Sequence, residues 1–243
     1  MKIIVTKDYK EMSSQAAALI AKEIKENPQA LLALSTGSSP MGTYEEMIRL
    51  HKEEGLDFRQ IRSLNMDEYI GLDKNHPQGY NYFMNHYLYQ HVNIDTKNTF
   101  GPDAVNQNLN QAALDFDQKI KDEGGIDLIL LGIGRDGHIA FNMPSNELSL
   151  ATHIQKLSKA TIKDNSRFFD DVNQVPVEAM TIGIENIFKS KKIVLVASGD
   201  SKSEIIAKFI HSETLRTDVP ATLLKLHKDI TVIVDKAAAQ DLS

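Results

Sequence analysis

The sequence contains no cysteine, and this absence removes several classes of site at once. Disulfide frameworks, thiolate nucleophiles and cysteine-ligated zinc all need a residue that the chain lacks. The sequence also has no GxxxxGK[ST] phosphate loop, no HExxH zinc motif and no GxSxG nucleophile elbow. Nucleotide hydrolysis and zinc or serine hydrolysis are therefore disfavoured. The chemistry that remains is that of histidine, carboxylate and methionine side chains.

The 243 residues also lack a block of basic residues and a long apolar run near the amino terminus. The net charge is -6, from 27 basic and 33 acidic residues, so nucleic acid is not an expected partner. The apolar run at residues 3–5 is too short for a signal peptide or a membrane span. We therefore expect a cytoplasmic protein with no membrane partner, in which local positive groups would hold a small anionic ligand.

Repeats, low-complexity tracts and linker-like segments are absent as well, which favours a single domain over residues 1–243. Predicted strands alternate with predicted helices along most of the chain. This alternation predicts an α/β fold with a mostly parallel sheet covered on both faces. Residues 177–188 show no clear pattern. We expect strands at residues 3–6, 30–34, 61–66, 126–131, 153–157, 192–198 and 230–234, and helices at 8–26, 41–54, 80–92, 109–122 and 202–210.

Three glycines, Gly132, Gly134 and Gly137, follow the most apolar of these strands. Their spacing matches the GxGxxG dinucleotide fingerprint, so an oxidoreductase has to be considered. The context differs, because Pro144 interrupts the segment that should become a helix, and the acidic residue expected about 20 positions further on is missing. We therefore interpret the glycines as allowing a ligand to approach the backbone closely.

A histidine and two carboxylates lie at predicted strand ends. His138 comes two residues after Asp136 in the glycine-rich loop, and Asp67 follows the predicted strand 61–66. A histidine of ordinary pKa, about 6.5, suits proton transfer near neutral pH. Because the carboxyl ends of parallel strands share one edge of a sheet, Asp67 is expected to face His138. The alternatives are a histidine held by hydrogen bonds in a turn and a carboxylate that caps the next turn.

The small polar loop Thr36-Gly37-Ser38-Ser39 lies between a predicted buried strand and a predicted helix. Backbone N–H groups and the positive end of the helix dipole favour an anion such as phosphate at this place. The alternative is an ordinary helix start with proline at its first position. Arg167 and Lys202 are candidate phosphate ligands, although a lone basic residue is more often a solvated charge.

Taken in order along the chain, these segments resemble the glucosamine-6-phosphate deaminase family. The likeness covers nearly the whole sequence, and the set is far more specific than any one motif. The segments that carry it are residues 35–41 (STGSSPM), 64–69 (LNMDEY), 132–144 (GIGRDGHIAFNMP), 165–169 (NSRFF), 171–176 (DVNQVP) and 199–202 (GDSK).

The resemblance implies a Rossmann-like three-layer α/β sandwich with a mostly parallel central sheet. It implies the conversion of glucosamine 6-phosphate and water to fructose 6-phosphate and ammonia, without a metal or an organic cofactor. In this reaction His138 would assist opening of the sugar ring, Asp67 would move a proton between C2 and C1, and Asp136 would orient the histidine. The implied ligands of the sugar phosphate are Thr36, Gly37, Ser38, Ser39, Arg167 and Lys202.

One position departs from the family pattern. The family usually has Phe-Asn-Glu-Pro where this chain has Phe141-Asn142-Met143-Pro144. Methionine cannot accept a histidine hydrogen bond as a carboxylate does, and it carries no negative charge. A weaker ring-opening step is therefore expected, unless Glu147 compensates.

Alternative functions stay open at this point. The same chemistry on another amino-sugar phosphate, such as galactosamine 6-phosphate, would explain Met143 as part of an altered pocket. A non-catalytic sugar-phosphate sensor would keep the binding loop without turnover. A lactonase of the 6-phosphogluconolactonase type fits less well, because residues 65–69 suit a proton shuttle better than activation of water. The chain ends soon after its last predicted strand, so we expect a monomer or a small homo-oligomer.

Overall fold

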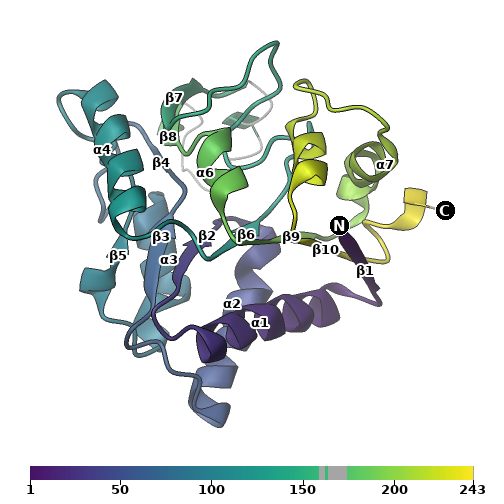
Figure 1. Cartoon of the computed structure of the whole chain (residues 1–243), viewed down its shortest axis with the longest axis horizontal. Helices are drawn as coiled ribbons and strands as arrows, with labels where there is room; N and C mark the ends of the chain where they lie inside the picture. The colour runs from purple at the N-terminus through teal and green to yellow at the C-terminus, as the bar shows by residue number, and fades with distance from the viewer. Residues whose placement is uncertain (159–161, 164–173, 243) are drawn as a thin grey trace.

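The computed structural model describes residues 1–158, 162–163 and 174–242, and a seven-stranded sheet forms its centre (Figure 1). All neighbouring strands in this sheet are parallel, as the sequence predicted. The strand order is β1-β10-β9-β6-β2-β3-β5. The strands are β1 (Lys2–Thr6), β2 (Leu31–Leu34), β3 (Arg62–Asn65), β5 (Thr99–Phe100), β6 (Leu128–Leu131), β9 (Lys192–Ala197) and β10 (Ile230–Asp235).

Helices cover both faces of the sheet (Figure 1). Each face has its own apolar core, one containing Met12 and Tyr44 and the other containing Phe116 and Phe209. Strands buried on both faces consist of continuous apolar runs, and β2 is buried throughout. This is the predicted three-layer sandwich. One layer contains α1 (Tyr9–Glu26), α2 (Ser38–Glu54) and α3 (Tyr80–Tyr87), and the other contains α4 (Leu109–Asp122), α6 (Ile184–Lys189) and α7 (Ser203–His211).

Helix boundaries follow local capping signals. Asp8 caps α1 by accepting a hydrogen bond of 2.8 Å from the Glu11 N–H, and Gly55 ends α2 in a left-handed conformation. The bounds of α4 match the prediction, whereas α2 begins three residues earlier than expected and α3 ends at Tyr87. None of the helices within the described ranges is long and apolar enough to cross a membrane. Short 3₁₀ segments lie at Tyr89–His91, Thr96–Asn98, Asp200–Lys202, Pro220–Leu226 and Gln240–Leu242.

The direction of strand addition reverses between β2 and β6. From β2 the chain continues outward through β3 and β5, and from β6 it continues the other way through β9 and β10. At such a reversal a crevice opens outside the carboxyl ends of the strands, and open α/β sheets bind ligands there. The two glycine-containing loops of the sequence leave β2 and β6, so the fold brings them to this crevice.

A second sheet of three antiparallel strands has the order β4-β8-β7. Its strands are β4 (Asp67–Tyr69), β7 (His153–Lys156) and β8 (Glu178–Thr181). The strand predicted at residues 153–157 is β7, and the strand predicted at 61–66 is β3, which ends at Asn65. Asp67 belongs to the separate strand β4, which was not predicted, and it pairs with Thr181 of β8. The pairing of β4 with β8 joins segments far apart in the chain. Such a pairing leaves no strong local pattern from which these two strands could be predicted.

Strand β8 also holds the loop that follows β6. The Phe141 N–H donates to Thr181 Oγ1 over 3.1 Å, and Asn142 Nδ2 donates to the Ile182 carbonyl over 2.9 Å. Thr181 is thus the register partner of Asp67 and a hydrogen-bond partner of the His138 loop. The second sheet fixes these two parts of the chain relative to each other.

Candidate active site

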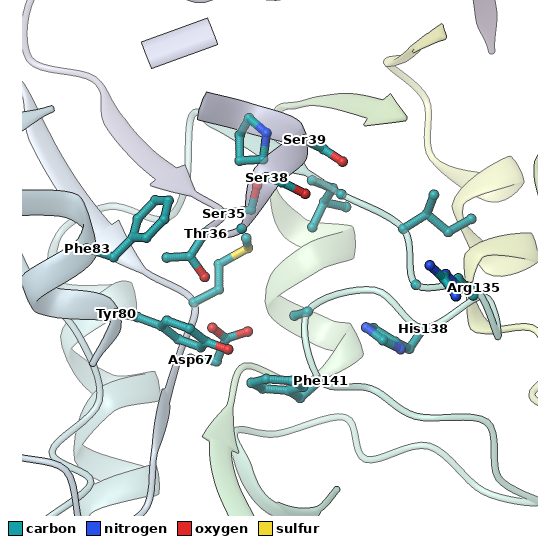
Figure 2. Close-up of a pocket in the computed structure, with 18 of the residues that line it drawn as sticks. Ser35, Thr36, Ser38, Ser39, Asp67, Tyr80, Phe83, Arg135, His138 and Phe141 are labelled. Atoms are coloured by element: carbon teal, nitrogen blue, oxygen red, sulfur yellow. The ribbon is translucent and has the colours of Figure 1, made fainter. Parts of the chain in front are cut away.

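A cavity of about 340 Å³ lies outside the carboxyl ends of the central strands (Figure 2). Its walls come from the loops after β2, β6 and β9, from β4, and from the start of α3. It therefore lies at the place where the strand order reverses. The lining residues are 35–40, Met66, Asp67, Tyr69, 77–80, Phe83, 131–135, His138, Ala140, Phe141, Ser198, Ser201 and Lys202.

The amino terminus of α2 forms one end of the cavity. Gly37 precedes the helix with a φ of +102°, a value that favours glycine, and no side chain in the described part of the chain caps the helix there. Its first N–H groups and its dipole therefore favour an anion. Thr36, Ser38 and Ser39 place side chains around this point (Figure 2). Because α2 begins at Ser38 and not at Met41, both serines belong to its first turn.

Two basic side chains belong to the same cavity. Lys202 was predicted, and its Nζ donates a hydrogen bond of 2.7 Å to the Ile133 carbonyl in the glycine-rich loop. Arg135 was not predicted, although its position inside that loop could have indicated it. Arg167 lies outside the described residues. The cavity thus combines positive side chains with a helix amino terminus, which suits a phosphorylated ligand.

His138 and Asp136 form a hydrogen-bonded pair in the loop after β6. Asp136 Oδ1 lies 2.6 Å from His138 Nδ1 and accepts the His138 N–H over 3.1 Å. Burial works to raise the pKa of Asp136, but its hydrogen bonds with His138 outweigh burial and hold the pKa below its ordinary value. The pair leaves His138 Nε2 as the ring nitrogen for a ligand, because Nδ1 already has its partner. His138 lines the cavity, and Asp136 supports it from behind.

Two glycines of this loop lie where a Cβ atom would collide with a neighbouring side chain. A Cβ at Gly134 would lie 2.2 Å from His138 Nδ1, so only glycine leaves room for the imidazole. Gly137 has a φ of +89°, and a Cβ there would lie 2.7 Å from Val219 Cγ1. Gly132 and Gly134 both line the cavity, and Gly132 has open space at its Cβ position, whereas Gly137 is not among the lining residues. The interpretation that the glycines let a ligand approach the backbone stays a prediction.

Asp67 projects into the cavity from β4, and Tyr80 lies beside it in Figure 2. Burial and the nearby charge of Glu68 raise the pKa of Asp67 to about 8. A carboxyl group with such a pKa exchanges a proton near neutral pH, as a general base must. Asp67 and His138, which the sequence predicted to face each other, both line this cavity.

Glu68, next to Asp67, points away into the protein and caps α3. Its carboxylate accepts backbone N–H hydrogen bonds from Tyr69 and Tyr80, each 2.9 Å, and from Asn81 over 3.0 Å. Burial raises the pKa of Glu68, and the three N–H bonds oppose that rise. Glu68 therefore ties β4 to the first turn of α3, although twelve residues separate it from Tyr80.

An aromatic wall, which sequence reasoning missed, lies between Asp67 and His138. The ring centroids of Tyr69 and Tyr80 are 4.8 Å apart, and the Phe141 ring is 6.0 Å from each. Burial raises the pKa of Tyr80 well above its ordinary value, so its hydroxyl stays protonated. Only the tertiary structure brings these rings together, although a tyrosine-rich helix start was visible in the sequence.

Met143 packs against this wall from the protein side and is not among the lining residues. It is 5% exposed and belongs to an apolar cluster with Tyr69, Phe141, Leu157 and Ala179. A carboxylate on this side chain as oriented would lie in apolar surroundings. Glu147 is exposed and also lies outside the described lining.

The site thus joins an anion-binding end to a base and a histidine–carboxylate pair. Such groups can move protons on a small anionic molecule. Among the residues that the structure describes, no three histidine, aspartate or glutamate side chains gather in a way that would hold a metal ion.

Comparison with known proteins relates the whole chain to one family. The family model described as glucosamine-6-phosphate isomerases/6-phosphogluconolactonase matches residues 7–233. Proteins named glucosamine-6-phosphate deaminase from Clostridium perfringens (strain 13 / Type A) and Clostridium tetani (strain Massachusetts / E88) are 47% and 48% identical over 240 residues, 99% of each chain. A solved structure described as a monomeric glucosamine-6-phosphate deaminase has a TM-score of 0.96 and 39% identity, and covers 99% of this chain and 100% of its own.

Proposed function

The chain belongs to the family of glucosamine-6-phosphate isomerases and 6-phosphogluconolactonases, and we propose that it is a glucosamine-6-phosphate deaminase. It converts glucosamine 6-phosphate and water to fructose 6-phosphate and ammonia. The observation that carries this function is the joint presence of Asp67, His138 and the α2 amino terminus in one cavity of about 340 Å³. This volume is within the range of small-molecule sites.

The phosphate group binds at the α2 end. Backbone N–H groups after Gly37 and the hydroxyls of Thr36, Ser38 and Ser39 donate to its oxygens, and Lys202 supplies positive charge. We assign Arg167 to the same group on the family resemblance alone. With its phosphate held here, the sugar extends toward the aromatic wall and the proton-transfer groups.

Ring opening is the role of His138. Its Nε2 takes the proton of the C1 hydroxyl and passes it to the ring oxygen as the bond between C1 and that oxygen breaks, which gives the aldehyde. Asp136 holds Nδ1 at 2.6 Å and stabilises the charged imidazole. Met143 faces an apolar cluster and offers no second carboxylate. The histidine and Asp136 therefore carry out this step as a pair.

Asp67 is the base for the second stage. Its carboxylate removes the C2 proton of the open chain while O1 takes a proton from the C2 ammonium group, which gives an enolamine, and Asp67 then returns its proton to C1. The resulting imine at C2 reacts with water, and ammonia leaves. The raised pKa of Asp67, about 8, supports this role because the group both takes and gives the proton.

The alternatives expected from the sequence are less well supported. Relatives 45–48% identical over nearly the whole chain are named for glucosamine 6-phosphate, so galactosamine 6-phosphate is not favoured. A comparison of kcat/KM for the two sugars decides between them. The intact pair His138–Asp136 and the tuned Asp67 argue against a sensor without turnover, since binding alone needs neither.

We infer that the protein is a monomer, supported by the structural relative described as monomeric. The family model over residues 7–233 supports one domain for residues 1–243. A phosphorylated sugar substrate supports the cytoplasmic location that we expect.

The direct test is to incubate the purified protein with glucosamine 6-phosphate and measure ammonia and fructose 6-phosphate together. We expect both in equal amounts. Tight binding of the sugar with no product after long incubation would instead make the protein a sensor, and hydrolysis of 6-phosphogluconolactone alone would make it a lactonase.

The role of Asp67 is tested by exchange in deuterated water. The Asp67→Asn variant should bind glucosamine 6-phosphate with nearly the wild-type Kd but fail to exchange the C2 proton with solvent. Glu11→Gln, at the start of α1 and outside the cavity lining, is the control and should exchange normally. Normal C2 exchange in Asp67→Asn would remove Asp67 as the base.

A further inference from the structure

The turn that carries Lys202 to the cavity has an unusual backbone. Residues 198–202 follow β9, and Ser198, Ser201 and Lys202 line the cavity. Gly199 has a φ of +88° and a ψ of 155°, a combination that is essentially restricted to glycine. The Lys202 N–H then donates to the Gly199 carbonyl over 3.0 Å to close the turn. Such a conformation persists only where other groups hold it.

Asp235, the last residue of β10, holds the base of this turn. Its carboxylate accepts hydrogen bonds from Ser198 Oγ and from the Gly199 N–H, the latter at 3.1 and 3.2 Å to its two oxygens. It also accepts the Ala238 N–H over 2.8 Å. Asp235 is only 6% exposed, and it lies outside the cavity lining. Its contacts are therefore with the turn and not with a ligand.

The three partners of Asp235 all donate hydrogen bonds to it, and this explains why a carboxylate occupies position 235. An ionised aspartate only accepts hydrogen bonds, whereas an asparagine would present an NH₂ group to at least one donor. In a buried place such a conflict leaves a polar group without a partner. The position therefore requires an acceptor on both of its side-chain atoms.

The other end of the turn is held as well. Lys202 Nζ donates to the Ile133 carbonyl over 2.7 Å, and Ser203 Oγ donates to Asp241. Asp235 is the last residue of β10, and Asp241 lies in the 3₁₀ segment that follows this strand. The carboxyl-terminal segment 235–241 thus anchors the turn on either side of Lys202.

We propose that Asp235 is a positioning residue for the anion end of the cavity. By fixing Ser198 and Gly199 it sets the place of the Lys202 ammonium group relative to the α2 amino terminus, so that both bind the same phosphate group. This inference rests on the proposed function only for the identity of the ligand as a sugar phosphate. Without Asp235, the turn relaxes and phosphate binding weakens, while Asp67, Asp136 and His138 keep their contacts.

The test compares Asp235→Asn with Asp117→Asn. Asp117 is a matched control, because it is 8% exposed and accepts hydrogen bonds from Thr152 and Asn186, all outside the cavity lining. Dissociation constants for inorganic phosphate are measured by calorimetry, and KM and kcat are measured with glucosamine 6-phosphate. In Asp235→Asn we expect the phosphate Kd and the KM to rise about tenfold, as loss of one buried hydrogen bond predicts, with kcat changed less than about threefold.

Asp117→Asn should lower the melting temperature similarly and leave both Kd and KM unchanged. An Asp235→Asn variant that binds phosphate like the wild type would overturn the proposal, and so would an equal rise of KM in Asp117→Asn. Phosphate binding is read without turnover. A wild-type protein that binds phosphate but releases no ammonia would therefore count against the proposed function and leave this inference standing.

A second variant covers the case in which Asp235→Asn does not fold. Gly199→Ala places a Cβ in open space, with no atom within 4 Å, but its backbone cannot keep the conformation of Gly199. The turn must then shift while the Asp235 carboxylate stays. We expect the same rise in phosphate Kd and KM with little change in kcat. Wild-type phosphate binding in Gly199→Ala would show that the turn does not position the anion, and the proposal would be wrong.

Discussion

Met143 shows how one side chain sets the electrostatics of the histidine loop. It packs with Tyr69, Phe141 and Ala179 and is 5% exposed, so methionine, where the family resemblance implies glutamate, contributes apolar contact and no charge. Within the described part of the chain, the carboxylate that pairs with the His138 imidazole is that of Asp136. The sequence led us to expect lower activity from this change, and the structure adds that the space is already filled.

We predict that Met143→Glu destabilises the protein and does not increase kcat. A carboxyl group in the apolar cluster loses its hydration and costs about 2–4 kcal/mol, or becomes protonated. Thermal unfolding and ammonia release measure the two effects. Met143→Leu is the control and should retain nearly full stability. A Met143→Glu variant with wild-type stability and higher kcat would mean that the side chain turns toward His138.

Asp67 couples activity to stability through its pKa. The folded protein raises this pKa to about 8, above the unfolded value of 3.8, so the folded state binds the proton more tightly. Its contribution to stability is complete below pH 3.8 and is lost as the pH rises to about 8. The same titration frees the base, so kcat/KM of the wild type should rise with pH and level off above pH 8.

Asp67→Asn should therefore be more stable than the wild type at alkaline pH, by on the order of 2 kcal/mol at pH 9, and equal to it near pH 4. Denaturant unfolding at several pH values measures this difference. A constant difference across the whole range would mean that the Asp67 pKa is not raised.

At the scale of elements, α3 depends on a residue outside itself. No side chain within the described helix start caps it, and Glu68 of β4 accepts the N–H groups of Tyr80 and Asn81 instead. The capping group thus arrives from the strand that carries the base. The contact holds the backbone of Tyr80, whose ring packs against Tyr69 and Phe141.

We predict that Glu68→Gln costs about 1.5–3 kcal/mol of stability, because charge-assisted hydrogen bonds to backbone N–H groups are lost. It should also lower kcat through displacement of Tyr80, and shift the rise of kcat/KM to lower pH, because the Glu68 charge helps to raise the Asp67 pKa. Glu11→Gln is the control, since Glu11 accepts the Lys7 N–H at the start of α1. That control should leave the pH profile unchanged, and an unshifted profile in Glu68→Gln would contradict the assigned role.

For the whole molecule, the state of assembly is indicated by the solved relative of 39% identity, which is described as monomeric. We therefore predict that specific activity is independent of protein concentration from nanomolar to micromolar, and that the protein elutes as a monomer in size-exclusion chromatography. Activity that falls on dilution, together with a larger species at high concentration, would show that a second copy is needed.

Sequence reasoning succeeded where the information is local. Local patterns predicted α4 and six strands of the central sheet but not the short β5. The ends of predicted strands indicated Asp67, His138 and the loop before α2. Sequence reasoning found β7 but missed the other two strands of the second sheet, because β4 has three residues and β8 pairs with segments distant in sequence. It also missed Tyr80, Phe141 and Asp235, whose roles depend on packing and on contacts between separate loops.

The second sheet has a consequence for which sugars fit. Thr181 of β8 contacts both the strand of Asp67 and the loop of His138, so the second sheet fixes the spacing of the two proposed proton-transfer groups. In the proposed binding mode the phosphate lies at the amino terminus of α2, which packs on the central sheet. The two sheets therefore set the distance between the phosphate end and the proton-transfer groups, and this distance selects the length of the substrate. A phosphorylated amino sugar with one carbon more or fewer would leave either its phosphate or its reacting carbons out of reach.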